Sequence, residues 1–245
     1  MKAYIPFIVT ALAISPAVAQ PAPTAPAVAP ARLVAAKPCE PATPETGQNG
    51  ELIYTGCQIK AMGGTLPKLI TAPKEPDLSN LYQKGIQGEV VFDLIIGNDG
   101  TIRDVAIKGS SRSPELDAIA MGLVNGSKFS PAADQFGKPV DVRAALPMYF
   151  WKDSMIDQKY FKKSCRDFLT DVKWRAEHFP EESVEQYRGW LLAKGAMVIG
   201  SIRSAGGLSA IGQNREFPKT PTYSDVVDGC KAKPDRPFFD VLTGR

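Results

Sequence analysis

The sequence has little of the chemistry on which enzymes depend. Its 245 residues include one histidine, His178, and four cysteines. Serine and cysteine nucleophiles need a base within hydrogen-bond distance, and the motifs G-x-S-x-G, S-x-x-K and H-E-x-x-H do not occur in the chain. The zinc-ligand spacing C-x-x-C is missing as well. We therefore expect no enzyme activity, no metal site and no cofactor.

An excess of charge of one sign is also missing. The chain has 29 Lys and Arg against 26 Asp and Glu, a formal net charge of +3. The basic residues are scattered, and no basic run is interleaved with aromatic residues. This balance excludes the strong electrostatic attraction on which nucleic-acid binding depends. We expect no nucleic-acid partner.

Apolar residues form one run near the start and none later that reaches the roughly 20 residues needed to span a bilayer. Lys2, the uncharged stretch Tyr4–Ile14 and Ala17-Val18-Ala19 have the order of a cleaved signal peptide. We expect residues 1–19 to be removed and the protein to be exported to the periplasm. The alternative is an uncleaved inner-membrane anchor with the protein facing the periplasm.

The four cysteines are typical of an oxidising compartment. They allow three pairings, and because each half of the chain holds two, we favour Cys39–Cys57 and Cys165–Cys230. Residues 20–50 are rich in proline and alanine and predict an extended linker. The first cysteine pair would close a flap that continues over residues 51–72 and contains a short strand over Glu51–Thr55.

Residues 73–151 have the patterns of a small α+β domain. In the first predicted strand, apolar residues alternate, as expected for a half-buried strand: Val90, Phe92, Leu94 and Ile96. Asn98-Asp99-Gly100 supplies residues that tolerate the positive φ of a tight turn. A return strand follows, with Val105 and Ile107 predicted to face inward.

A helix and a final strand complete this domain. Ser113-Pro114 is typical of a helix start, because serine caps free N–H groups and proline fits the first turn; Gly126 ends the helix. Its apolar stripe is Leu116, Ile119, Ala120, Leu123 and Val124. The last predicted strand, over residues 140–150, alternates again at Val140, Val142, Ala144, Leu146 and Met148.

Pro147 lies inside this last strand. Proline has no N–H to give to a neighbouring strand, so the strand is predicted to lie at a sheet edge. One interpretation is an edge that binds an extended peptide through its main chain. The other is that proline only prevents sheets from associating with one another. The alternation of residues does not decide between the two.

The same residues resemble the TonB C-terminal domain family. The matches are Gly85, Gly88, Val90, Asp99, Gly100, Leu116, Asp117, Ala120, Phe129, Pro131, Gly137, Pro139 and Val140. Ser127 stands where the family often has tryptophan, and the proline-tyrosine-proline entry is weak around Pro76. The resemblance implies a β-β-α-β arrangement of a small antiparallel sheet and a helix. It also implies a last strand that pairs with the box segment of an outer-membrane receptor.

Residues 152–245 predict a small helical domain stapled by Cys165 and Cys230. Helices are expected over residues 157–179 and 180–202, with Pro180 in the first turn of the second. Within residues 222–242, we expect a third helix that contains Cys230 and then a last turn around Phe238–Leu242. The spacing resembles HdeA/HdeB-type periplasmic acid-stress proteins at Cys165, Phe168, Leu169, Trp190, Gly195, Cys230 and Pro234. That resemblance implies a chaperone-like domain, and a stapled bundle sharing only the architecture is the alternative.

The sequence thus predicts a periplasmic protein that binds a partner protein or receptor peptide by β-strand addition, linked to TonB-type outer-membrane transport. The expected binding residues are Val140, Val142, Ala144, Leu146 and Met148. A second copy of the chain is an alternative partner for this edge. A membrane-anchored energy transducer is the first alternative function. The second is an acid-stress chaperone whose client binding rises as Glu181, Glu182 and Glu185 become protonated.

Overall fold

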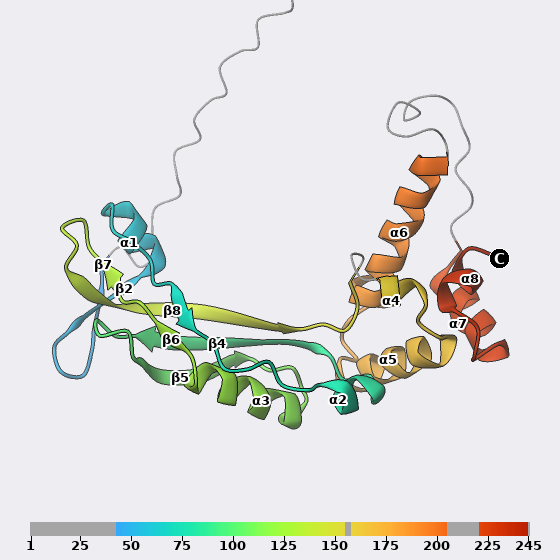
Figure 1. Cartoon of the computed structure of the whole chain (residues 1–245), viewed down its shortest axis with the longest axis horizontal. Coiled ribbons are helices and arrows are strands. Elements are labelled where there is room, and N and C mark those ends of the chain that lie inside the picture. Colours follow the sequence, from blue (N-terminus) through green and yellow to red (C-terminus); the bar gives the residue numbers. More distant parts are fainter. Residues whose placement is uncertain (1–42, 155–157, 205–220, 245) are drawn as a thin grey trace, which may run out of the picture. The chain divides into compact units, whose positions relative to one another are not determined.

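The computed structural model describes residues 43–154, 158–204 and 221–244, which belong to one compact unit from Pro38 to Arg245 (Figure 1). The predicted signal peptide, most of the predicted linker and the connection over residues 205–220 lie outside the described residues. Cys57 is disulfide-bonded. Its predicted partner, Cys39, lies outside the described residues, so that pairing stays a prediction.

One mixed sheet forms the body of the first half. Its strand order is β1-β2-β8-β4-β5, and β7 pairs with one end of β8. The strands are β1 (Glu45–Thr46), β2 (Leu52–Thr55), β4 (Gly88–Ile96), β5 (Ile102–Gly109), β7 (Ala132–Ala133) and β8 (Pro139–Phe150). Only β2 and β8 run parallel; the other paired strands are antiparallel. With helix α3 (Pro114–Asn125) between β5 and β8, the predicted α+β class and β-β-α-β order are confirmed.

The turn between β4 and β5 has the residues that its conformation demands. The Gly97 N–H donates to the Thr101 carbonyl at 2.8 Å. Asp99 accepts hydrogen bonds from the hydroxyl and N–H of Thr101, which lower the pKa of the Asp99 carboxyl. Gly100 has a φ of 81°, and a Cβ there would lie 2.2 Å from the Phe129 carbonyl oxygen. Glycine is therefore required for both its φ and its small size.

Alanine at Gly100 is expected to lower the free energy of unfolding by about 3 kcal/mol, from left-handed backbone strain and a forced displacement of Phe129. Gly137→Ala is the matched control, because Gly137 has a φ of 79° but nothing within 4 Å of an added Cβ. It should lose only the strain, about 1–2 kcal/mol. Urea unfolding of the two variants checks this. Equal losses would contradict a role for the contact with Phe129.

Helix α3 packs its apolar stripe on one face of the sheet. Ser113 caps the helix by accepting the Leu116 N–H. Asp117 accepts from the hydroxyls of Ser110 and Ser111 and from the Ser111 N–H, and so ties the serine-rich turn to the helix. The buried core comprises Ile59, Leu78, Leu81, Val90, Phe92, Leu94, Ile96, Leu116, Ala120, Val124, Ala132, Val142 and Phe150.

Four short elements border this core. They are α1 (Gly56–Ala61), β3 (Leu69–Thr71), α2 (Ser79–Gln83) and β6 (Lys128–Phe129). Strands β3 and β6 pair as a separate two-stranded sheet. Thr55 and Gln58 form a capping box that begins α1 directly after β2, so the strand predicted over Glu51–Thr55 is present and leads straight into a helix.

The later described residues are helical. The elements are α4 (Gln158–Phe161), α5 (Cys165–His178), η1 (Val184–Gln186), α6 (Arg188–Ser204), α7 (Tyr223–Ala232) and α8 (Phe238–Leu242). The predicted helix start at Pro180 is wrong, because the chain turns there and a capping box between Ser183 and Gln186 begins η1 instead. Among the described residues, no helix is both long and apolar enough to cross a bilayer.

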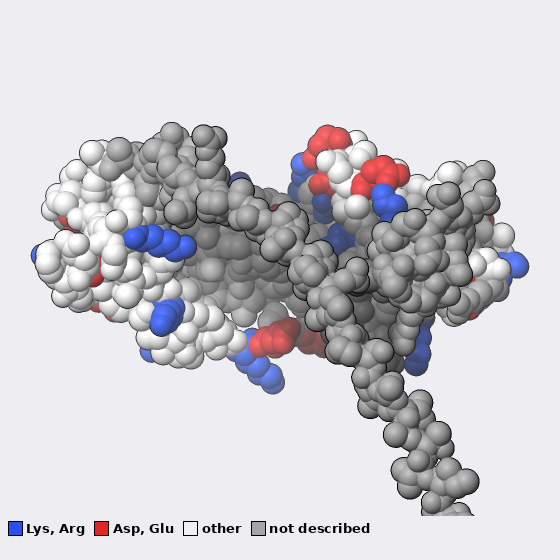
Figure 2. Space-filling model, turned by 90° about the horizontal axis from the view of Figure 1, so that it is seen from above, with Lys and Arg blue, Asp and Glu red and all other residues white. Residues whose placement is uncertain are grey.

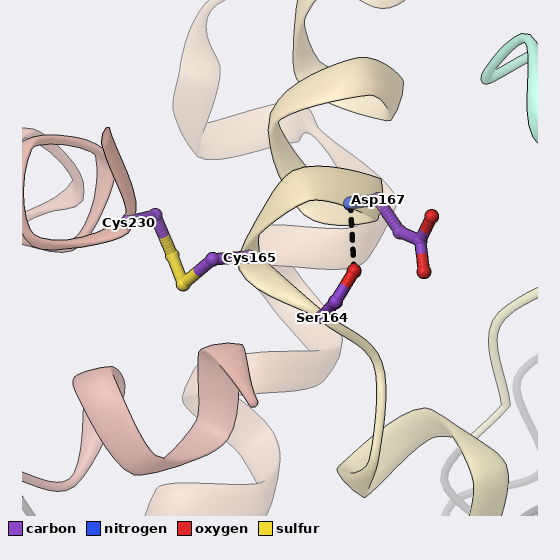
Figure 3. Close-up of a disulfide and its surroundings, with 4 residues drawn as sticks. All are labelled: Ser164, Cys165, Asp167 and Cys230. Atoms are coloured by element: carbon purple, nitrogen blue, oxygen red, sulfur yellow. Dashed lines mark hydrogen bonds between the residues drawn. A yellow bond between two sulfur atoms is a disulfide. The ribbon is translucent and has the colours of Figure 1, made fainter. Parts of the chain in front are cut away.

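A disulfide joins two of these helices. Cys165 at the start of α5 is bonded to Cys230 near the end of α7, as predicted (Figure 3). Ser164 caps α5 by accepting the Asp167 N–H at 3.1 Å, so that Cys165 is the first residue of the helix. Both cysteines are fully buried in a second core, which also includes Tyr160, Phe168, Tyr187, Trp190, Ala193, Val226, Phe238 and Leu242.

A buried ionic cluster connects the sheet to the helices. Lys163 donates to Asp153, just after β8, at 2.6 Å, and to Asp171 of α5. Asp171 also accepts from the Gln87 side-chain amide at 3.0 Å, and Lys152 lies 3.7 Å from its second oxygen. Lys163, Asp153 and Asp171 are each less than 10% exposed. The buried Lys163 and the partly exposed Lys152 therefore compensate the charges of the two buried carboxylates.

Candidate functional site

Strand β8 is paired differently along its two sides. On one side, its residues 142–150 pair with β4 without any shift of register. On the other side, β2 pairs with residues 141–143. Strand β7 pairs with Pro139 and Val140, beyond the last residue of β8 that pairs with β4. Among the described strands, none pairs with residues 144–150 on that second side. We call residues 144–150 the open half of β8.

The predicted edge is therefore shorter than expected. The prediction of an open edge is wrong for Val142, because Tyr54 of β2 already pairs with it. Val140 lies before the open half and pairs with Ala132 of β7. Ala144, Leu146 and Met148 lie in the open half, with partly buried side chains against the first core. Their role in binding stays a prediction.

Pro147 indicates which main-chain groups the open half presents. It is in register with Val91 of β4, and the pairs on either side of it continue. Because proline has no N–H, it fits a pair whose polar groups point away from the neighbouring strand. These directions alternate along a strand. The N–H groups of Ala145 and Tyr149 therefore point away from β4, as does the Pro147 carbonyl.

Two hollows lie along the open half. The first, of about 340 Å³, is lined by Val142, Ala144 and Leu146 of β8, with Leu66, Pro67 and Phe129 across from them. The second, of about 440 Å³, is lined by Leu146, Met148 and Phe150 and by Pro73, Leu123 and Ser127. Leu146 and Phe129 belong to both linings. Most lining residues are apolar, and the polar or charged ones include Arg143 in the first hollow and Glu75, Tyr82 and Ser127 in the second.

Ion pairs fasten β1 and β2 beside the open half. Arg143 of β8 donates to Glu45 of β1 at 3.0 Å and to Asp93 of β4 at 3.0 Å. Arg103 of β5 donates to Glu51 at 3.0 Å and to Asp141 at 2.6 Å. Hydrogen bonds from main-chain N–H groups, together with Arg103, lower the pKa of Glu51. These contacts hold the flap on the first part of β8.

The opposite edge of the sheet, along β5, is irregular. Its pairing with β4 shifts register twice, and Asp104 has a positive φ of 52°. Ile107, predicted to face inward, is instead 38% exposed at this outer strand. Bulges and kinks of this kind disfavour pairing with another strand. The open half of β8 is therefore more regular than the edge along β5.

The sequence of this part of the chain matches a known family. Residues 80–151 match the model of the Gram-negative bacterial TonB protein C-terminal. They belong to the TonB C-terminal family. Protein TonB of two Xanthomonas campestris pv. campestris strains is 30% identical over 83 residues, which cover 34% of this chain. The aligned part is 36% of each relative, so the chain spans about a third of the length of these relatives.

The structure explains why the motif residues of this TonB C-terminal domain are needed. Gly100 and Asp99 form the hairpin turn, and Leu116 and Asp117 anchor α3, as described above. Gly85 has a φ of 79°, and a Cβ there would lie 2.7 Å from the Thr170 carbonyl oxygen of α5. Gly88 begins β4. Phe129 and Pro131 lie close to Gly100, and Phe129 also lines the hollows.

Acidic residues proposed from the acid-stress resemblance lie elsewhere, around η1, and are ion-paired. Glu181 accepts from Arg112 at 2.9 Å, Glu182 from Arg175 at 2.8 Å, and Glu185 from Lys194. The hydrogen bond from Arg112 lowers the pKa of Glu181, and that from Lys194 lowers the pKa of Glu185. The chaperone hypothesis stays a prediction.

The ion pairs and the pairing of β2 with β8 are features that sequence reasoning missed. Arg143 and Asp141 alternate with the apolar residues of β8, which is a signal of one solvent-facing side, but it does not name their partners. On the described part of the face in Figure 2, basic and acidic residues are interspersed rather than gathered into one patch.

Proposed function

We propose that this protein takes part in TonB-type transport by binding an extended segment of a partner protein, such as an outer-membrane receptor, as an added strand on the open half of β8. The observation that carries this proposal is the lack of a described strand beside residues 144–150, on a strand whose other side is in unbroken register with β4. Periplasmic location is part of the proposal.

The main chain of the open half supports strand addition. The outward N–H groups of Ala145 and Tyr149 and the outward Pro147 carbonyl can each bond to a partner main chain, which is the source of affinity in β-strand addition. Strand β2 pairs with the same side of β8 a few residues earlier. An added strand would therefore lie next to the end of β2, along the same side of β8. Energy transduction would need a retained N-terminal anchor, a segment outside the described residues.

The test is a photo-cross-linking experiment in the native cell envelope. A photoreactive amino acid replaces Tyr149, whose side chain is 63% exposed on the open half. We expect a cross-link to the periplasm-facing segment of an outer-membrane receptor, identified by mass spectrometry. Adding Ala145→Pro should reduce its yield about tenfold, because one outward N–H is lost and the ring hinders the partner strand.

Ala145→Val is the matched control for this prediction, because it changes the side chain and keeps the N–H. It should leave the cross-link unchanged. Proline at position 145 spares the ladder with β4, whereas proline at Ala144 would remove an inward N–H. Thermal unfolding confirms that each variant is folded. A cross-link that persists in the folded Ala145→Pro variant would contradict strand addition at this edge.

A further inference from the structure

The side chains of a partner strand on the open half of β8 would pack into the two hollows beside it. We infer that the partner segment presents apolar side chains at alternate positions, with a large one, such as phenylalanine, in the hollow beside Ser127. This inference rests on the proposed strand addition and specifies the class of peptide that the site takes.

The alternation follows from how paired strands place their side chains. Residues opposite one another on neighbouring strands face the same side of the sheet. Tyr54 of β2 is opposite Val142, and both lie against the first core. Partner residues opposite Ala144, Leu146 and Met148 would face that same side. They would therefore meet the two hollows, which line this side of β8.

The chemistry of the hollows selects apolar groups. The first is lined by carbon-rich side chains, and its one charged neighbour, Arg143, already donates to Glu45 and Asp93. In the second, Ser127 is a small residue in a wall of proline, leucine and phenylalanine, and its hydroxyl donates to the Leu123 carbonyl at 2.8 Å. Glu75 and Tyr82 also belong to this lining. A large apolar side chain from a partner would pack beside Ser127, whose hydroxyl already has its hydrogen-bond partner.

On the other side of the added strand, polar side chains are favoured. Ala145, Pro147 and Tyr149 are exposed on the outer side of the open half. Partner residues opposite them would remain in contact with water and can be polar. The expected ligand is therefore an extended segment with one apolar and one polar side.

Strand β2 limits where such a segment can begin. It ends at Thr55, opposite Arg143, where α1 turns the chain away. An added strand must start beyond that point, and residues 144–150 then offer about 20–23 Å of edge at about 3.3 Å per residue. The pairing continues a sheet interface that already exists between β2 and β8.

The test uses two synthetic nonapeptides of identical composition, with the full chain and fluorescence anisotropy. One alternates valine and threonine around a central phenylalanine, and the other holds the same residues in an apolar and a polar block. We expect the alternating peptide to bind at least about tenfold more tightly, since only it can place all its apolar groups on one side. Ala145→Pro should weaken this binding.

Ser127→Trp should fill the second hollow and weaken binding of the phenylalanine peptide about tenfold, while an alanine-centred version is unaffected. Asn125→Trp, exposed at the end of α3 and outside the lining, is the matched control. Equal affinity for the two nonapeptides, or binding of neither, would overturn the inference. The cross-link from position 149 tests the proposed function separately, because it does not depend on these peptides.

Discussion

Replacing Lys163 by methionine is expected to cost about 3–5 kcal/mol of unfolding free energy at pH 7, the usual range when one partner of a buried ion pair is removed. The change leaves Asp153 and Asp171 buried. Among the described residues, the cation that remains close to Asp171 is Lys152, at 3.7 Å. Urea unfolding followed by tryptophan fluorescence measures the loss. Lys173→Met, on the exposed side of α5, is the matched control and should cost less than about 0.5 kcal/mol.

The pH dependence of the variant gives a second check. Burial raises the pKa of Asp171 in the folded protein, and Lys163 and Lys152 oppose that rise. Without Lys163 the folded pKa should rise further, so the folded state takes up this proton before the unfolded state does. The stability deficit is then present above the folded pKa and shrinks as the pH falls through it. A deficit that stays constant from pH 7 to pH 4 would contradict uncompensated charge as its cause.

The same cluster behaves differently at high pH in the unchanged protein. Burial alone would lower the pKa of Lys163, but the charges of Asp171 and Asp153 outweigh it and raise that pKa. The contribution of Lys163 to stability is therefore fully present below its ordinary pKa and is lost only as the pH rises through the higher folded value.

Removing the Cys165–Cys230 disulfide, as a double alanine variant, is expected to cost about 4 kcal/mol. The bond closes a loop with a sequence separation of 65 residues, and a loop of this length gives about that value in the chain-entropy model. Alanine is used because both sulfurs are fully buried among apolar side chains, where serine would add an unpaired hydroxyl. The helical transition in urea measures the effect.

The controls for the disulfide prediction separate the bond from the packing. Each single alanine variant should lose about as much as the double variant, since either change breaks the same bond. A loss below about 1 kcal/mol in the double variant would show that the packing around Phe168 and Phe238, which stack with ring centroids 4.9 Å apart, holds α5, α7 and α8 together without the disulfide.

The parts of the fold that were predictable are those in which a local pattern decides the structure. Apolar alternation predicted β4 and β8, Asn98-Asp99-Gly100 predicted the turn from β4 to its hairpin partner β5, and Ser113-Pro114 predicted the start of α3. Each of these signals acts within about ten residues. The disulfide between Cys165 and Cys230 was also predictable, because only a few pairings were available.

The pairing of β2 with β8 was not predictable, since it joins residues almost 90 positions apart and involves only three pairs. This pairing changed the candidate site, because β2 covers Val142 and leaves residues 144–150 unpaired on that side among the described strands. The junction around Lys163 was missed for a related reason. Lysine and aspartate usually lie at the surface, and nothing in their spacing shows that Asp153 and Asp171 converge on one amine.

The predicted helices over residues 157–179 and 180–202 are divided into shorter segments, and local hydrogen bonds are the cause. Ser164 accepts a hydrogen bond from the Asp167 N–H, and Ser183 forms a capping box in which its N–H donates to the Gln186 side chain at 3.1 Å. Each begins a new helical segment at that point. Pro180 is compatible with a helix start, but acidic residues beside it are used for ion pairs with Arg112 and Arg175.

The arrangement of edges also limits how this protein can associate with itself. A sheet grows into a fibre only when each addition leaves another flat, unpaired strand at its margin. Here the margins are β1, which has two residues, and β5, which is bulged. The open half of β8 instead belongs to an inner strand, and it is unpaired because its neighbour β2 is shorter than β8. If two copies paired through their open halves, each would cover the other's unpaired residues, and assembly would stop at a dimer.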